Sequence, residues 1–566
     1  MTVGNSYGKK SVILPAILVR LTTSSGASAV PQTADFIITS ARVLTQNLQQ
    51  PRAEAVAVRG NRIAFVGSAA EAENFRGPAT RVIDGQQCTL LPGFIDSHFH
   101  LYWGCQWLGV AQLYTATTTE AVLDILREYA AQHPDEAWVE GRGLRYDLIT
   151  GRKELDVIAP DRPAYVVAYD GHTTWANTKA LELAGILHSG EPIGPNSVIV
   201  RDEHGLATGE LREAGASELV RRIAPEPTAE RKRTLLNKGL KLIAQAGVTS
   251  VHNMNGDMEE LSVYAALEDA GELSLRVYVP YHVKPETPFE ALAEAAEMAK
   301  VKGDLARGGA AKFFMDGVLE SWTALMVEPY VDKPDSYGDS LFSHEHFVRM
   351  AAECDRLGLQ IFVHCCGDGA VRRTLDGYEA IQKLNGRRDS RHRVEHIEMI
   401  HPDDLPRFKQ LGVLGSIQPL HSPLNVNDGD VWPTRAGKQN WHRSFAWRTL
   451  KNAGVHLALG SDWPVVTYDP MWGVYAALNR TPWQAGDPDH HLSLDETLAG
   501  YTRDAAYAEF MENEKGQLAP GFLADMVLLN ADLEQTPKEA LANPETLETN
   551  VKPVLTMTDG KVVFEG

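Results

Sequence analysis

The chain has 566 residues and a formal net charge of −20, with 44% apolar and 23% charged residues, which is the composition of an ordinary globular protein. This length exceeds one small domain but suits a single barrel with insertions. The negative charge argues against a nucleic-acid partner, no apolar run approaches the ~20 residues of a membrane span, and five cysteines do not make a disulfide framework.

Residues 1–30 have an ambiguous pattern. Lys9 and Lys10 precede the apolar run Val12–Val19, and the segment Ala27–Ala29 offers a cleavage site for a secretory signal peptide. The alternative is a disordered extension, which the short apolar run favours slightly. We expect a cytoplasmic protein if the extension is retained, and a periplasmic or secreted one if a signal peptide is removed. Neither alternative assigns these residues to the fold.

Short strand patterns at both chain ends predict one composite β-sandwich. Residues 35–44 and 55–67 alternate in strand fashion, and residues 516–529 and 554–564 carry further strands with a hairpin signal at Asp559-Gly560. Neither end alone has enough strands to cover a hydrophobic face. We therefore assign residues 31–90 and 510–566 to one β-sandwich domain.

Apolar strands alternate with helical segments over residues 91–509, which predicts a parallel α/β fold. Several strands follow a glycine that ends the preceding helix, at Gly247, Gly358, Gly412 and Gly454. Eight such units predict a (β/α)8 TIM barrel, whose active site lies at the C-terminal ends of the strands. The expected strands are Phe94–Ser97, Val248–His252, Leu275–Tyr281, Ala311–Met315, Gln360–His364, Arg393–His396, Val413–Gln418 and Val455–Gly460.

An insertion of about residues 101–235 separates the first two barrel strands. It contains strand-like segments of its own, such as residues 164–169. Because it leaves the barrel at the C-terminal end of a strand, we expect it to cover the barrel mouth.

The first barrel strand ends in two histidines, His98 and His100, after a Pro-Gly entry turn. Side chains alternate across a strand, so both imidazoles point the same way. Two imidazoles that converge from one strand end can bind a divalent metal ion. An isolated pair of this kind is more often a surface feature, but further ligand types recur downstream.

These further candidates lie at later strand ends: Lys312 on the fourth strand, His364 on the fifth, His396 on the sixth and Asp462 just after the eighth. The C-terminal ends of barrel strands meet at one mouth. Histidines together with a carboxylate form a zinc-type set of ligands. The sequence therefore predicts a divalent metal centre at the barrel mouth.

Together, these motifs resemble the amidohydrolase superfamily, and specifically amidohydrolase family 3, which includes N-substituted formamide deformylases. The resemblance extends from about residue 35 to the C-terminus. The matching segments are Pro92–His100, Asp170–His172 with Asn177, Lys312–Gly317, Val363–Asp368, Arg393–Glu398 and Gly460–Val465.

The resemblance implies one ion held by His98, His100 and Asp462, and a second held by His364 and His396. Lys312, carboxylated by CO2, would bridge them as a carbamate, because an ammonium group has no lone pair to donate. The alternative is an unmodified Lys312 in an ion pair, with one metal bound. Zinc is the expected metal, although manganese, iron and cobalt accept the same ligands.

Metal chemistry suggests the mechanism. A metal-bound water loses a proton near neutral pH, and the hydroxide is then the nucleophile. Asp462 would act as general base and then as general acid. The resemblance implies that His172 hydrogen-bonds the substrate carbonyl or the oxyanion; a structural role in the insertion is the alternative. We expect His252, Glu395 and Asp368 to lie beside the ligands rather than among them.

Tryptophans near the predicted strand ends suggest an apolar, aromatic substrate pocket, although they can equally pack beneath the insertion. The candidates for substrate contact are Trp103, Trp175, Trp322 and Trp463, with Trp107 close by. Cys365 and Cys366 depart from the family pattern, in which small residues commonly follow the histidine.

The sequence thus predicts a metal-dependent hydrolase of C–N amide-type bonds, acting on a small N-acyl or N-formyl amine. Ester or lactone hydrolysis and deamination of a cyclic amidine are alternative reactions for the same site. A non-catalytic metal-binding protein is a further alternative, which the complete ligand set disfavours. A homodimer is expected only because dimers are common among relatives.

Overall fold

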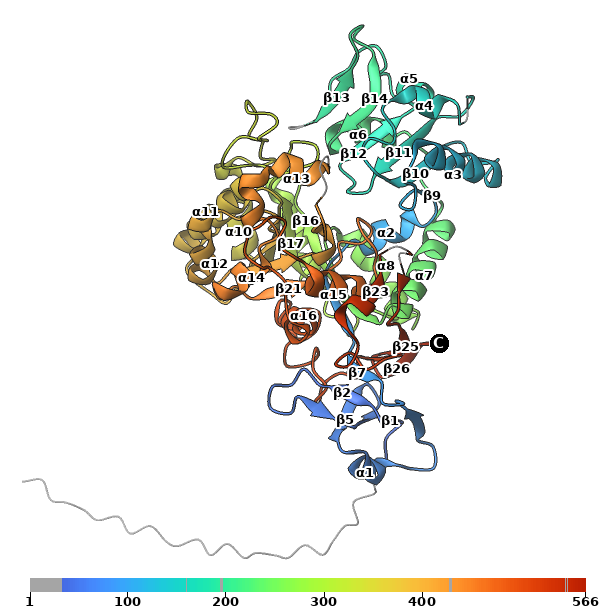
Figure 1. Cartoon of the computed structure of the whole chain (residues 1–566), viewed down its shortest axis with the longest axis vertical. Coiled ribbons are helices and arrows are strands. Elements are labelled where there is room, and N and C mark those ends of the chain that lie inside the picture. Colours follow the sequence, from blue (N-terminus) through green and yellow to red (C-terminus); the bar gives the residue numbers. More distant parts are fainter. Residues whose placement is uncertain (1–32, 159, 194–196, 427–429, 545, 547) are drawn as a thin grey trace, which may run out of the picture.

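Eight parallel strands form one curved sheet at the centre of the molecule, in the order β8-β15-β16-β17-β18-β19-β20-β21 (Figure 1). The computed structural model describes residues 33–158, 160–193, 197–426, 430–544, 546 and 548–566. The expected signal peptide or extension, residues 1–30, lies outside these ranges. Among the described residues, no helix is long and apolar enough to cross a membrane.

All eight strands predicted from the sequence overlap strands of this sheet, so the predicted TIM-like barrel is confirmed. The strands are β8 (Phe94–Phe99), β15 (Val248–Asn253), β16 (Arg276–His282), β17 (Ala306–Phe314), β18 (Gln360–Cys365), β19 (Arg393–His396), β20 (Leu414–Ile417) and β21 (Leu457–Leu459). The fourth, β17, begins five residues earlier than expected, because the glycines and alanines before Ala311 extend the pairing with β16.

Helices follow the barrel strands, and several of them pack against the sheet. They are α7 (Ala229–Gln245), α8 (Met258–Asp269), α9 (Leu292–Met298), α10 (His344–Arg356), α11 (Asp368–Asn385), α12 (Leu405–Leu411), α13 (Val431–Ala436), α14 (Trp447–Asn452), α15 (Pro470–Asn479), α16 (Leu494–Gly500) and α17 (Arg503–Tyr507). The glycines expected after helices, at 247, 358, 412 and 454, all have positive φ. The short αβ turns are therefore confirmed.

Two sheets pack on one another at the chain ends, and one of them contains strands from both ends, which confirms the composite β-sandwich. One sheet has the order β5-β4-β1-β6 and the other β26-β25-β22-β7-β2-β3. Strand β7 pairs with β22, so that Leu90 lies opposite Leu528 across the junction of the two ends. The strands are β1 (Phe36–Thr39), β2 (Arg42–Leu44), β3 (Arg52–Ala53), β4 (Ala55–Arg59), β5 (Arg62–Gly67), β6 (Arg81–Asp84), β7 (Thr89–Pro92), β22 (Met526–Leu529), β25 (Pro553–Thr558) and β26 (Lys561–Glu565).

The insertion forms a third body at the opposite end of the barrel from the sandwich (Figure 1). Its sheet has the order β13-β14-β12-β11-β10-β9. The strands are β9 (Ala111–Gln112), β10 (Val139–Leu144), β11 (Ala164–Ala168), β12 (Thr173–Ala176), β13 (Val198–Arg201) and β14 (Ala207–Arg212), and the helices are α2 (Leu101–Trp107), α3 (Thr119–Gln132), α4 (Arg152–Asp156), α5 (Thr178–Leu183) and α6 (Ala214–Arg221). Hydrogen bonds from Tyr169 to Glu320 and from Arg142 to the carbonyl of Pro464 tie the insertion to loops at the barrel mouth. The boundaries assigned to the three parts from sequence stay a prediction.

Candidate metal centre

The barrel closes at the point where its first and last strands meet. The N–H of Asp462 donates to the carbonyl of His98 at 2.7 Å, and the N–H of His100 donates to the carbonyl of Trp463 at 2.8 Å. Gly460 permits this approach, because a Cβ there would lie 2.5 Å from the backbone nitrogen of His98. The chain closure itself therefore places Asp462 beside the two histidines of β8.

A buried cluster of His98, His396 and Asp462 lies at this closure. One potential ligand atom from each residue lies within 4.8 Å of the other two. The Asp462 carboxylate is 3.4 Å from His98 Nε2 and 3.1 Å from His100 Nε2. This spacing fits a shared divalent ion, and it brings together three of the predicted ligand histidines with the predicted aspartate.

The ring of His98 is held by a buried charged pair. Its Nδ1 donates to Glu395 at 2.7 Å, and Glu395 forms contacts of 2.8 and 2.9 Å with the guanidinium of Arg393. Because Glu395 accepts a hydrogen bond from the protonated Nδ1, the neutral ring carries its free lone pair on Nε2, the nitrogen nearest Asp462. Burial and the nearby charge of Lys312 hold the pKa of His98 well below its usual value, which favours the neutral, metal-binding form.

His364 and Lys312 stand on the other side of the cluster. His364 donates from Nδ1 to Asp316 at 3.1 Å, and its ring centre lies 4.6 Å from that of His396. The amine of Lys312 is fully buried. Burial lowers the pKa of Lys312 to about 8, so a reactive neutral amine is accessible near neutral pH.

Several buried polar atoms at the mouth have no hydrogen-bond partner among the described residues. They are Lys312 Nζ, His396 Nδ1, His421 Nε2 and Asp462 Oδ1. Unpaired buried polar atoms are costly, and such groups usually coordinate an ion or bind water. The neutral imidazoles of His98, His364 and His396 and the carboxylate of Asp462 make a donor set that fits a divalent metal.

His421 is part of this cluster, although sequence reasoning missed it. It lies in a short turn, residues 419–421, after β20, and its ring stacks on His396 at 5.6 Å. Its Nε2 is 3.5 Å from Asp462 Oδ2. Burial opposes a charge there, but Glu398 and Asp462 raise the pKa of His421. The available signal was its position just after the seventh predicted strand.

The insertion brings His172 to the mouth, where its ring centre lies 5.8 Å from that of His364. His172 donates from Nδ1 to Glu213 at 2.8 Å, and Glu213 also accepts from Thr323 of the barrel at 2.5 Å. Burial disfavours the imidazolium, but Glu213 and Asp170 outweigh it and raise the pKa of His172 to about 10. The predicted hydrogen bond from His172 to a substrate carbonyl or oxyanion stays a prediction.

The four tryptophans proposed for substrate contact lie in different places. Trp103 lies 5.1 Å from the ring of His100, and Trp463 directly follows Asp462 and packs on Phe99. Trp322 stacks on the guanidinium of Arg435 instead of a ligand ring. Trp175 is 3% exposed and belongs to the core of the insertion. Only Trp103 and Trp463 therefore contact the ligand-bearing segments.

Of the residues expected beside the ligands, only one contacts a candidate ligand. Glu395 contacts His98 as expected, and His252 contacts Arg393 at 2.8 Å rather than a candidate ligand. Asp368 accepts from the N–H of Val327 and pairs with Arg443, so its expected contact with a ligand is wrong. Asp316, which the sequence did not single out, makes that contact instead.

Comparison with known proteins assigns the chain to a family. A model of the amidohydrolase family matches residues 81–564. The chain belongs to the amidohydrolase family. Family 3, the branch expected from the motifs, is confirmed.

Sequence similarity to known relatives extends over most of this amidohydrolase. It is 31% identical over 519 residues to Protein LONG AFTER FAR-RED 3 of Arabidopsis thaliana, with 88% of each chain covered. It is 28% identical over 547 residues to the N-substituted formamide deformylase of Arthrobacter pascens, covering 93% of this chain and 98% of the deformylase. A metal-dependent hydrolase from Pyrococcus horikoshii has a similar structure, with a TM-score of 0.69 and 25% identity over 87% of this chain and 96% of its own. Together with the buried cluster, these likenesses support a metal-dependent hydrolase.

Proposed function

We propose that this amidohydrolase cleaves the C–N bond of a small N-formyl or N-acyl amine with an apolar or aromatic substituent. The observation that carries the proposal is the buried cluster of His98, His396 and Asp462, in which His396 and Asp462 each have a buried polar atom without a partner among the described residues. The likeness to a formamide deformylase over nearly the full length of both chains supports the amide-type bond. Trp103 and Trp463, at the edge of the cluster, support an apolar substituent.

The residues at the mouth have separable roles in this proposal. His98, His100 and Asp462 would hold one zinc ion, His364 and His396 a second, and carboxylated Lys312 would bridge them. Zinc suits imidazole and carboxylate ligands, and a bound divalent metal would supply an acidic water and polarise the scissile carbonyl. Asp462 would move the proton from water to the leaving amine, because its carboxylate already lies at the centre of the cluster.

His172 would bind the substrate carbonyl oxygen. Its Nδ1 proton is held by Glu213, which leaves Nε2 to face the mouth. Because its pKa is raised to about 10, His172 is an imidazolium at neutral pH and can donate a charge-assisted hydrogen bond. The contact of Glu213 with Thr323 fixes the insertion relative to the barrel at this point.

Metal analysis and turnover test the proposal together. We expect up to two zinc ions per chain and hydrolysis of N-formyl amines with aromatic substituents, measured by release of formate. Intact mass under gentle ionisation, with bicarbonate present, should show one added CO2 that Lys312→Gln lacks. Cleavage of esters or cyclic amidines but of no formamide would refute the assigned bond, and an unmodified Lys312 with full metal would refute the carbamate.

A further inference from the structure

A pocket lies beside the segment that follows Asp462. It has a volume of about 280 Å³ and is bounded by the end of α2, by β10 and by the loop after β21. Its walls include the rings of Trp107, Tyr114, Trp463 and Tyr468. Gly104 lets Trp463 form one wall, because a Cβ at residue 104 would lie 2.2 Å from the indole ring. The pocket therefore has flat, mostly apolar walls and directly adjoins the segment that carries Asp462.

Arg142 is the one cation that lines this pocket among the described residues. Its side chain is buried, with 1% of the residue exposed, and one nitrogen, Nη2, donates to the carbonyl of Pro464 at 2.6 Å. Nε and Nη1 have no hydrogen-bond partner among the described residues. Buried guanidinium groups are normally paired with carboxylates. An anion bound at these two unpaired N–H groups would therefore stabilise the buried charge of Arg142.

The surroundings of Arg142 do not supply that anion. Its guanidinium carbon lies 3.6 Å from the ring centre of Trp107 and 5.1 Å from that of Tyr114. These aromatic faces stabilise the charge, and the Tyr114 hydroxyl donates to the same Pro464 carbonyl that Arg142 contacts, but neither residue supplies a carboxylate. Arg221 lies 5.8 Å from the same Trp107 ring and adds a second positive charge. Asp170, the nearby acid, already accepts from Tyr146 and from the N–H of His172.

We propose that this pocket binds a small organic carboxylate with a flat apolar body, and that Arg142 contacts the carboxylate. The unpaired N–H groups of Arg142 would receive the anion, and the rings of Trp463 and Tyr468 would pack against the body. A volume of about 280 Å³ suits a molecule near the small end of ligand size.

Such a carboxylate has two sources. It is either the far end of a substrate whose reacting bond lies at the metal centre, or a separate small molecule. The first is sterically natural, because Trp463 both follows Asp462 and forms a wall of the pocket. The second would place a ligand against the segment that carries Asp462 without occupying the metal centre.

Binding to the full-length, metal-free chain tests the site itself. Isothermal titration with phenylacetate and its neutral analogue phenylacetamide compares the anion with a shape of similar size. We expect phenylacetate to bind at least tenfold more tightly, since hydrogen bonds to charged groups give about that discrimination. Arg142→Gln should remove the preference. Absence of phenylacetate binding at millimolar concentration, or an unchanged preference in Arg142→Gln, would overturn the proposal.

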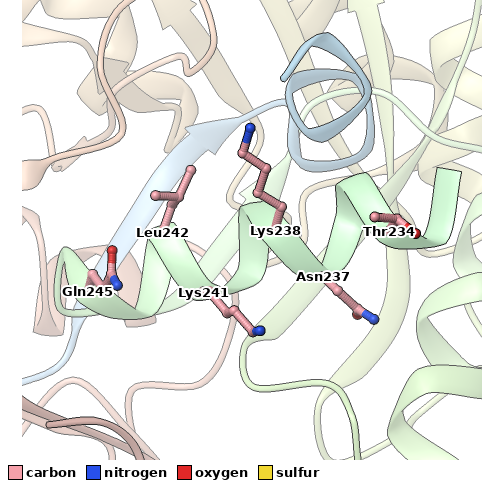
Figure 2. A pocket seen from close by; sticks show the side chains of 6 residues that line it. All are labelled: Thr234, Asn237, Lys238, Lys241, Leu242 and Gln245. Atoms are coloured by element: carbon pink, nitrogen blue, oxygen red, sulfur yellow. The ribbon is translucent and has the colours of Figure 1, made fainter. Parts of the chain in front are cut away.

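Two further variants serve as controls, one for misfolding and one for non-specific electrostatic attraction. Val466→Phe narrows the pocket but keeps Arg142, and should abolish binding while the melting curve stays cooperative. Lys241→Gln is the matched loss of a positive charge at another hollow, of about 500 Å³, whose lining residues all come from α7 (Figure 2). Because Lys241 is exposed, its loss should leave phenylacetate binding unchanged. Equal loss of binding in Lys241→Gln would show non-specific attraction and overturn the site.

Turnover then distinguishes the two sources, and this second step rests on the proposed function. A substrate end in the pocket predicts that Arg142→Gln raises KM for an N-formyl amine with a carboxylate tail but not for a neutral one, and that phenylacetate competes. A separate ligand predicts binding without competition. If no formamide is hydrolysed, the proposed function fails, whereas the binding result with metal-free protein still stands or falls on its own.

Discussion

Replacing Glu395 with glutamine removes one charge from the buried pair that orients His98. Glu395 and Arg393 have fully buried side chains, and among the described residues Glu395 is the only carboxylate paired with Arg393. Breaking such a pair costs about 3–5 kcal/mol. Because glutamine keeps the volume and one acceptor oxygen, we expect the lower end, about 3 kcal/mol. The loosened His98 should also lower metal affinity by about 10- to 100-fold.

These two effects need separate measurements, because bound metal itself stabilises the folded state. Chelator competition gives the metal affinity, and denaturant unfolding of metal-free protein gives the stability. Glu297→Gln is the control, since it removes a carboxylate from an exposed pair with Lys300 and should change stability by no more than about 0.5 kcal/mol. If metal-free Glu395→Gln unfolds like the wild type and binds metal equally well, the reasoning about His98 is wrong.

Three further predictions follow from individual residues. Asp462→Asn should lower kcat by at least about 100-fold in formate release, while elemental analysis still finds metal; normal turnover would refute its role in proton transfer. Gly104→Ala should lower stability by about 1–3 kcal/mol in denaturant unfolding, because its Cβ meets Trp463; an unchanged midpoint would show that the wall yields freely. Burial opposes ionisation of Asp355, but hydrogen bonds from His392 and Asn385 dominate and lower its pKa to about 2. The folded pKa is depressed, so the contribution of about 2 kcal/mol is present above pH 4 and is lost as the pH falls towards 2. Unfolding of Asp355→Asn should therefore converge with the wild type over that range, and a constant difference would contradict the assignment.

The barrel could be predicted from sequence because each strand carries its own local signal. Apolar runs, helix-ending glycines and strand-end ligands recur from one strand–helix unit to the next, and each depends on only a few neighbouring residues. His98 and His100 are an example, since strand alternation alone places both imidazoles on one side. The composite sandwich was also predictable, because neither chain end has enough strands by itself.

The partners of the candidate ligands were harder to predict, because their contacts join distant segments. Asp316 contacts His364, and Glu395 contacts His98, only once the barrel is formed. Asp368 was a natural alternative to Asp316, since it also follows a ligand motif, but it begins helix α11 and pairs with Arg443. A one-dimensional pattern does not state which of two nearby acids faces the mouth.

The position of Trp175 in the insertion was also not predictable from the sequence pattern. Its strand, β12, has two faces, and the sequence does not indicate which one the insertion's core covers. The indole lies in that core beside Tyr146. His421 was missed because the short turn after β20 returns its ring to His396, a reversal that strand periodicity does not encode.

The closure of the barrel at its candidate metal ligands has a consequence for the order of events in synthesis. His98 and Asp462 come from the first and last barrel strands, and the backbone bond between them forms only when both are present. A ribosome therefore completes nearly the entire barrel before the site can hold an ion. We therefore expect a truncated product that lacks the residues after β20 to retain His98, His364 and His396 but to lack Asp462, and so to bind a divalent metal more weakly than the full chain.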